Sequence, residues 1–481
     1  MSNAVVRPSM EELIPVYQEL LPRQKIKALA KVSGVTLYWR LFSPLIVLWG
    51  FIYQRFDTDH TCDGFVSHLY TGGADNLDPD DSHISPLSKR LKSENSSGYC
   101  QGRIRLPLSI IQGCLSYTAK KIASWLPSRE AEGDQERGRW KGFVVRLLDG
   151  TTFRLRPLGN LVESYGQACN QHGASYWVVV RSMVAFCLYS QSVVSYAEGR
   201  TTISEQAMVK QLMEADPEEN SLYVGDQGLG VYQVVQIAHH FSKKVVLRVT
   251  RSVAQSLQKR NSSARYLKPG EERTVFWSPQ RRNKLEPGLP VLPIEGRIIY
   301  ARIETPGFRP MDIYLFTTLL DQELYSATEI VELYGQRLRV EIDYRHIKTT
   351  LEMEQFEVKS AEMFRKELAA GLLTYNLICG LMVKAAQIGQ LLPSQLSFAR
   401  CWRRIRHTLF QGVPVWVYEQ GDVQNYLLKR LAKCIIPHQP NKVRHEPRKV
   451  RRRPAPFPPL IGDRNKARQE ILDQFLEQAK T

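Results

Sequence analysis

The stretch Tyr334–Lys348, YGQRLRVEIDYRHIK, places Glu341 among several cations. Positions four and seven apart lie on one side of an α-helix, so Tyr334, Arg337, Glu341, Arg345 and Lys348 share a stripe. A neighbouring stripe is mostly apolar, and no proline interrupts the run. The sequence therefore predicts a helix with one buried face and one polar face. The apolar stripe consists of Leu333, Val340, Tyr344, Ile347 and Leu351.

Two interpretations of this segment are open. Arg337, Glu341 and Arg345 could form i,i+4 ion pairs on a solvated helix face, each pair contributing a few tenths of a kcal/mol. Alternatively, the carboxylate could hold a metal ion while the neighbouring cations hold a polyanion. The segment alone does not decide between them, so the rest of the chain must.

The charge of the whole chain favours a polyanionic partner. Its 481 residues include 65 Lys or Arg against 48 Asp or Glu, a formal net charge of +17. Such an excess is typical of nucleic-acid-binding proteins. The length predicts two to four domains, and a hydrophobic content of 43% is that of a globular protein.

Cysteine spacing and apolar runs exclude other classes. The eight cysteines include no C-x2-C pair, so zinc-finger spacing is absent and a reducing cytosol is expected. The first residues lack the pattern of a signal peptide. The most apolar run, Leu41–Tyr53, is too short to span a bilayer and is predicted to be a buried helix.

The hydrophobic periodicity of the chain changes near residue 135. Before it, helical periodicity dominates, and cations that we expect to be exposed could contact a DNA backbone. After it, β-type runs alternate with helical ones, which predicts a mixed α/β core. The cations of the first region are Lys89, Arg90, Lys92, Arg103 and Arg105.

Two aspartates complete a possible trio with Glu341. GFVVRLLDGTTFRLRPL reads as a hairpin with Asp149 and Gly150 at its turn, which puts Asp149 at the end of a strand. Asp226 ends the strand in SLYVGDQ. Three carboxylates suit two divalent ions in phosphodiester cleavage, because Mg²⁺ prefers oxygen ligands. Plainer alternatives are a turn residue for Asp149 and a helix cap for Asp226.

The spacing Y-x2-R-x3-E-x6-K, formed by Tyr334, Arg337, Glu341 and Lys348, resembles the signature of the DDE transposases of bacterial insertion sequences. The group in question is named after insertion sequence four. LLDGTTFRL and YVGDQGLGVYQVV resemble its two aspartate segments. The likeness covers roughly residues 140 to 410. Arg345 lies on the same helix stripe but outside the signature.

The resemblance implies a DNA transposase that cleaves the ends of an insertion sequence and joins the 3′-hydroxyl to target DNA. Asp149, Asp226 and Glu341 would bind Mg²⁺ or Mn²⁺, two ions in all. Tyr334, Arg337, Lys348 and, off the signature, Arg345 would contact DNA. The partners would be double-stranded DNA, at the element ends and the target, and a second copy in a synaptic homodimer. The location would be the bacterial cytoplasm, at the nucleoid, with no membrane contact.

The fold class expected is α/β, with an RNase H-like core interrupted by a β-rich insertion. The expected division is a helical DNA-binding domain (1–135), the first part of the core (136–250), the insertion (251–325), the second part of the core (326–400) and a basic region (401–481). Alternatives are a Mg-dependent nuclease without strand transfer and a non-catalytic DNA-binding relative. The basic tail Asn441–Arg453 could also touch DNA.

Two departures from the family pattern concern the flanks of the site. Gln227 and Leu229 stand where the second aspartate segment usually has Arg and an aromatic residue. The insertion of this group often offers an aromatic side chain to a flipped base, and the sequence does not choose among the candidates. These are Trp277, Tyr300, Tyr314 and Phe316.

Overall fold

The computed structural model describes residues 15–75, 77–78, 85–126, 138–170, 173–280, 283–304, 310–337, 345–436 and 462–478, with the backbone of Val5–Val6. They fall into two compact units. The small unit comprises 303–311 and 439–481, and its helix is α19 (Arg464–Gln478). Everything below concerns the large unit.

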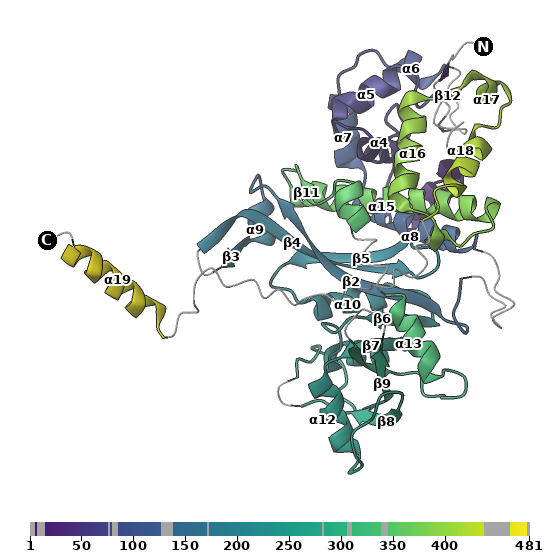
Figure 1. Ribbon diagram of the computed structural model, residues 1–481. Helices are drawn as coiled ribbons and strands as arrows, with labels where there is room; N and C mark the ends of the chain where they lie inside the picture. Colours follow the sequence, from purple (N-terminus) through teal and green to yellow (C-terminus); the bar gives the residue numbers. More distant parts are fainter. Residues whose placement is uncertain are drawn as a thin grey trace. The chain divides into compact units, whose positions relative to one another are not determined.

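A mixed sheet forms the centre of the large unit (Figure 1). Three strands are antiparallel in the order β5–β4–β2, and β6 and β7 continue parallel to β2. Helices follow the parallel strands, as crossover connections require. The central strands are β2 (Val144–Leu155), β4 (Gly173–Cys187), β5 (Val193–Arg200), β6 (Ser221–Gly225) and β7 (Lys244–Val249).

The predicted hairpin at Asp149-Gly150 is wrong. β2 is one continuous strand, and it pairs with β4 from Arg146 to Leu155 without a break. Gly150 lies within the strand and against a side chain, not in a turn. A Cβ at this position would lie 2.5 Å from the carboxyl group of Glu205, at the start of α10 (Glu205–Glu214). Glycine at position 150 therefore marks the place where α10 approaches β2 closely.

The segment 251–325 adds three strands and a helix to this sheet. β10 pairs antiparallel with β7, so the sheet continues through β10, β9 and β8. The mixed α/β class is confirmed; the exact domain boundaries stay a prediction. The elements are α12 (Arg251–Asn261), β8 (Glu272–Trp277), β9 (Ile294–Ile303) and β10 (Met311–Thr317).

Each face of the sheet has its own apolar cluster, because successive side chains of a strand point to opposite faces. Leu147 and Phe153 of β2 belong to the cluster of α15 (Ala361–Ile388). Leu148 belongs to the cluster of α10, α11 (Tyr232–His240) and α12. Among the described residues, α15 alone has the length and apolarity of a membrane span, but 94% of its apolar window is buried within the protein, as in a core helix.

Among the described residues, seven helices precede the sheet, and they pack with α15 on one of its faces (Figure 1). The predicted buried helix at 41–53 is confirmed as α4, where Ser43 caps the first turn and Pro44 occupies its first position. The helices are α2 (Pro15–Leu20), α3 (Arg23–Val32), α4 (Pro44–Phe56), α5 (Cys62–Tyr70), α6 (Leu87–Arg90), α7 (Ser97–Arg105) and α8 (Leu108–Ala123).

Short elements and a second group of helices complete the unit. Among them is a single turn of π-helix, η2 (His346–Thr350). The others are β1 (Val5–Val6), α9 (Leu161–Tyr165), β3 (Gln167–Asn170), α13 (Ala327–Gly335), β11 (Gln355–Phe356), η3 (Pro393–Gln395), α16 (Phe398–Gln411), β12 (Val413–Pro414), α17 (Val415–Glu419) and α18 (Val423–Ala432).

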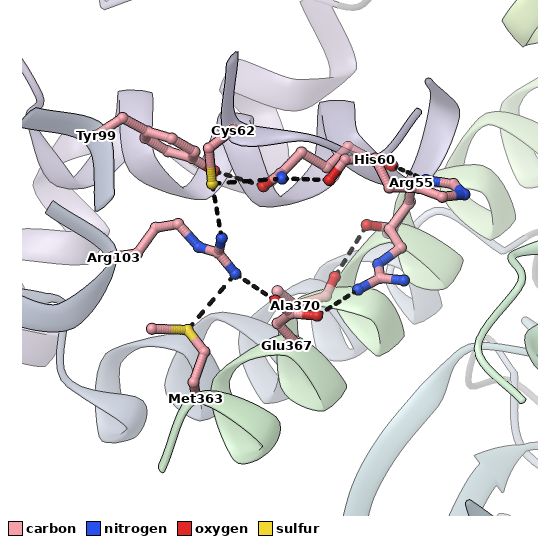
Figure 2. Close-up of polar contacts among 10 residues, drawn as sticks. Arg55, His60, Cys62, Tyr99, Arg103, Met363, Glu367 and Ala370 are labelled. Carbon is pink, nitrogen blue, oxygen red and sulfur yellow. Dashed lines mark hydrogen bonds and ion pairs between the residues drawn. The ribbon is translucent and has the colours of Figure 1, made fainter. Parts of the chain in front are cut away.

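A charged cluster joins the first helices to α15 (Figure 2). Glu367 of α15 accepts from Arg103 of α7 and, at 2.8 Å, from Arg55 of α4. Arg103 also donates to the sulfur of Cys62 at 3.0 Å, and its guanidinium lies 4.6 Å from the ring centre of Phe51. The expectation that Arg103 is an exposed, DNA-facing cation is therefore wrong: its charge is buried against Glu367.

Glu367→Ala should lower the free energy of unfolding by about 3 kcal/mol, because it leaves two largely buried guanidinium groups without their carboxylate. Denaturant titration followed by circular dichroism would measure this loss. The control is Glu357→Ala, which removes an exposed ion pair with Arg156 and should cost less than about 1 kcal/mol. Equal losses in the two variants would contradict a structural role for the Glu367 cluster.

Candidate active site

The parallel pairing of β2 with β6 brings two carboxylates side by side. Leu147 of β2 is in register with Val224 of β6. Asp149 and Asp226 each lie two residues further along, so they are at the same level of the sheet. Alternation puts both on the face of Leu147 and Val224, which is the face covered by α15. The structure thus joins two of the three predicted acids.

The two aspartates differ in their local setting. Asp226 directly follows the last residue of β6, as predicted, and its Oδ1 accepts from the N–H of Leu229 at 3.1 Å. Asp149 does not end a strand, contrary to the prediction; it lies inside β2 where the pairing with β6 has stopped but the pairing with β4 continues. Both backbones are therefore rigidly placed.

Arg337 lies between the two carboxylates. Its Nη2 is 3.0 Å from Oδ1 of Asp149 and 3.9 Å from Oδ2 of Asp226. The Arg337 side chain is 8% exposed, against 19% for Asp149 and 41% for Asp226. Arg337 therefore pairs across the fold with two strands, and its cation balances the two negative charges.

Tyr334 and Arg248 extend this polar group. Tyr334 lies near the end of α13 and is buried. Burial raises the pKa of Tyr334, while Arg337 and a hydrogen bond with the Arg248 side chain act in the opposite direction. The register of β6 with β7 places Arg248 beside Asp226. Arg248 was missed in the sequence, although its position in the strand after Asp226 could have suggested it.

An open hollow of about 330 Å³ adjoins Asp149. Lys348 belongs to η2, its Nζ lies 5.9 Å from the ring centre of Phe153, and Arg345 precedes η2 and is exposed. Burial lowers the pKa of Lys348, Glu354 and Asp149 act to raise it, and Arg154 adds to the lowering. Two predicted DNA-binding cations are therefore brought to Asp149. The hollow is lined by Asp149, Gly150, Thr151, Arg345, Lys348, Thr349 and Glu354.

Glu341, with residues 338–344, lies outside the described residues. The flanks of the predicted helix are described: α13 ends at Gly335 and η2 begins at His346. Three members of the predicted apolar stripe, Leu333, Ile347 and Leu351, are buried as expected. Val340 and Tyr344 fall in the same undescribed range as Glu341.

The aromatic candidates of the segment 251–325 are all buried. Trp277 meets Phe316 edge-to-face with ring centres 4.8 Å apart, and Tyr300 stacks on Tyr314 at 4.4 Å. All four belong to the cluster of α10, α11 and α12. In this structure none of them presents its ring to the surface. The tail Asn441–Arg453 lies outside the described residues.

The donors at this site fit divalent metal ions. Asp149 and Asp226 converge on one cation, the Arg337 guanidinium, and carboxylate oxygens are the ligands that Mg²⁺ prefers. Within the described part of the chain, no group of three acids, histidines or cysteines could by itself hold a metal. A third carboxylate would have to come from outside that part, where Glu341 lies.

Comparison with known proteins agrees with this geometry. Residues 140–377 match the family of the transposase DDE domain. The matched range contains Asp149, Asp226, Glu341 and the whole of the predicted signature. The match thus covers the central strands and most of α15, while helices α2 to α8 and α16 to α18 lie outside it.

One curated relative is the transposase InsG for insertion sequence element IS4 of Escherichia coli (strain K12). It is 25% identical over 266 residues, which are 54% of this chain and 57% of the relative. The alignment therefore spans less than two thirds of that protein. A solved structure of the piggyBac transposase synaptic complex with hairpin DNA aligns over 90% of this chain and 87% of its own, with 12% identity and a TM-score of 0.37.

Arg337→Ala should destabilise the metal-free protein, because Asp149 and Asp226 would face each other without their shared cation. We expect a loss of about 1–3 kcal/mol, less than for a fully buried pair because water reaches Asp226. Adding MgCl₂ should raise the melting temperature more in the variant than in the wild type, since the ion need not displace a guanidinium. Scanning fluorimetry in EDTA and in MgCl₂ measures both effects.

Arg345→Ala is the matched control for this comparison. Arg345 borders the same hollow but is exposed, so its removal should change stability by less than about 0.5 kcal/mol. Its response to MgCl₂ should equal that of the wild type. The same response in all three proteins would show that Arg337 does not compete with metal for the two carboxylates.

Proposed function

We propose that this protein is a DNA transposase that cuts and joins phosphodiester bonds at Asp149, Asp226 and Glu341. The observation that supports it most is the in-register pair Asp149 and Asp226 beside a hollow lined by Arg345 and Lys348. The pair lies inside the range that matches the transposase DDE domain. The signature Y-x2-R-x3-E-x6-K further favours the group named after insertion sequence four.

The catalytic core is proposed to be RNase H-like. In its support, three antiparallel strands are followed by two parallel ones in the order β5–β4–β2–β6–β7. The division into a helical domain (1–135), a core in two parts (136–250 and 326–400), an insertion (251–325) and a basic region (401–481) is part of the same proposal. The strands β8 to β10 of the insertion extend the core sheet.

Asp149, Asp226 and Glu341 would hold two Mg²⁺ or Mn²⁺ ions. When bound, such ions stabilise the charge on the attacking and leaving oxygens of a phosphodiester displacement. Lys348 and Arg345 would hold DNA phosphates at the hollow, while Tyr334 orients Arg337. Arg337 would first have to leave the carboxylates before its fork of donors could hold a phosphate.

The proposed reaction has two displacements at phosphorus. Water first frees a 3′-hydroxyl at the element end, and that hydroxyl then attacks a phosphodiester of the target. Neither step needs a covalent bond between protein and DNA. The proposed partners are double-stranded DNA at both places and a second copy of the chain in a homodimer. The bacterial cytoplasm, at the nucleoid, is the proposed location.

A nuclease of the same fold would use the same three acids without joining ends. A non-catalytic relative would bind DNA without cutting it. Incubating the protein with paired labelled ends, target plasmid and MgCl₂ separates the three possibilities. Joined products support transposition, cleavage without joined products supports the nuclease, and binding alone supports the non-catalytic relative.

Asp226→Ala should reduce DNA nicking by at least about 100-fold. The variant would lose a metal ligand, and the bound metal contributes several kcal/mol to stabilising the charge of the transition state. Asp149→Ala and Glu341→Ala should behave alike, while DNA binding in the absence of metal stays near the wild-type level. Nicking of a supercoiled plasmid in MgCl₂ is the measurement. Asp422→Ala, on the exposed turn before α18, is the control and should nick normally. Wild-type nicking by Asp226→Ala would exclude the proposed site.

A further inference from the structure

The exposed face of α16 is strongly basic. Its sequence, FARCWRRIRHTLFQ, contains four arginines, one histidine and no acid. The buried side holds Phe398, Cys401, Ile405 and Thr408. At 100° per residue, Arg400, Arg403, Arg406 and His407 fall on the opposite side. Arg400, Arg403 and His407 are exposed.

These cations are not neutralised by neighbouring acids. Within the described residues, no ion pair joins a carboxylate to any arginine of α16. Arg400 donates to the backbone oxygen of Ile435 at 3.1 Å, and Arg406 lies over the ring of Trp402. α18, which packs beside α16, adds three exposed cations. They are Lys429, Arg430 and Lys433. A solvated surface helix would ordinarily mix charges of both signs.

α16 begins next to the catalytic hollow. The ring of His346, the first residue of η2, stacks on Phe398 with centres 4.8 Å apart. Burial, and then Arg345, lower the pKa of His346 to about 4, so this ring is a neutral spacer at pH 7. Lys348, two residues later, lines the hollow beside Asp149. The short helix η2 therefore contacts the first turn of α16 and also lines the hollow.

The length of the face suits a DNA strand. Arg400 and His407 are seven residues apart, a rise of about 10 Å. The phosphates of one strand of B-DNA rise about 3.4 Å each along the duplex axis and also turn around it, so this straight span reaches about two neighbouring phosphates. An arginine fork can hold a phosphate with two hydrogen bonds. The face thus offers enough cations to hold about two phosphates of one strand.

We propose that the basic face of α16 binds the backbone of the duplex whose cleavage occurs at the hollow. α16 lies beyond residues 140–377, so the match to the transposase DDE domain does not extend to it. The contact would hold the DNA on the side of η2 away from the aspartates. This inference rests on the proposed function, because it assigns a path to the DNA that Asp149 and Asp226 would cut.

Salt dependence tests the surface directly. Each phosphate contact contributes about 0.9 to the negative slope of log K against log salt. Arg400→Gln/Arg403→Gln should therefore lower the slope by about 1.8. The probe is a fluorescein-labelled 40-bp duplex in EDTA, titrated by anisotropy at several KCl concentrations. Arg403 makes no polar contact with the other described residues, so Arg403→Gln alone should lower the slope by about 0.9, and Arg403→Lys should restore it.

The control is Lys259→Gln/Arg260→Gln, which removes the same formal charge from the exposed last turn of α12. It should change the slope by less than about 0.5. Equal changes in both double variants, or a wild-type slope in Arg403→Gln, would overturn the proposed surface. So would loss of self-association, measured by analytical ultracentrifugation, with the DNA slope unchanged, because it would assign the face to a second copy.

Failure of the inference is distinguishable from failure of the proposed function. If wild-type protein binds and nicks DNA while the α16 variants keep the wild-type slope, only the duplex path is wrong. If wild-type protein binds this duplex without any salt dependence, the proposed path of the duplex and the proposed function fail together. Circular dichroism melting of each variant separates a lost contact from a lost fold.

Discussion

The parallel pairing of β2 with β6 is the constraint on which the site depends. Two strands in parallel register keep equivalent positions level, so Leu147 opposite Val224 dictates that Asp149 stands beside Asp226. A one-residue slip would send one carboxylate to the opposite face of the sheet. The register is protected by the burial of Leu147 and Val224 against α15 on one face and of Leu148 on the other.

Like charges held side by side require a cation, and in this structure Arg337 supplies it. Its guanidinium comes from just after α13, a segment that also brings Tyr334 and leads toward Glu341 and η2. One short piece of chain therefore both neutralises the aspartates and supplies the cations of the hollow. Arg337 thus has its partners on two strands that are distant in the chain.

The sequence predicted the mixed α/β class, the strand end at Asp226 and the burial of Leu333, Ile347 and Leu351, because each follows from local periodicity. It misread Asp149-Gly150 as a hairpin, because the side chain that lies against Gly150 comes from Glu205, distant in the chain. Arg337 was expected on a polar helix face, and its pairing with two strands depends on tertiary packing. The local sequence pattern identifies functional residues more readily than it identifies the residues that they contact in the fold.

The contact of Glu367 with Arg55 and Arg103 has a mechanical consequence. Two separate helices, α4 and α7, grip one carboxylate on the long helix that backs the sheet. The first helices are therefore held to α15 and do not move independently of the sheet. If those helices recognise a DNA sequence, their fixed position relative to the sheet sets the number of base pairs between the recognised bases and the bond that is cut.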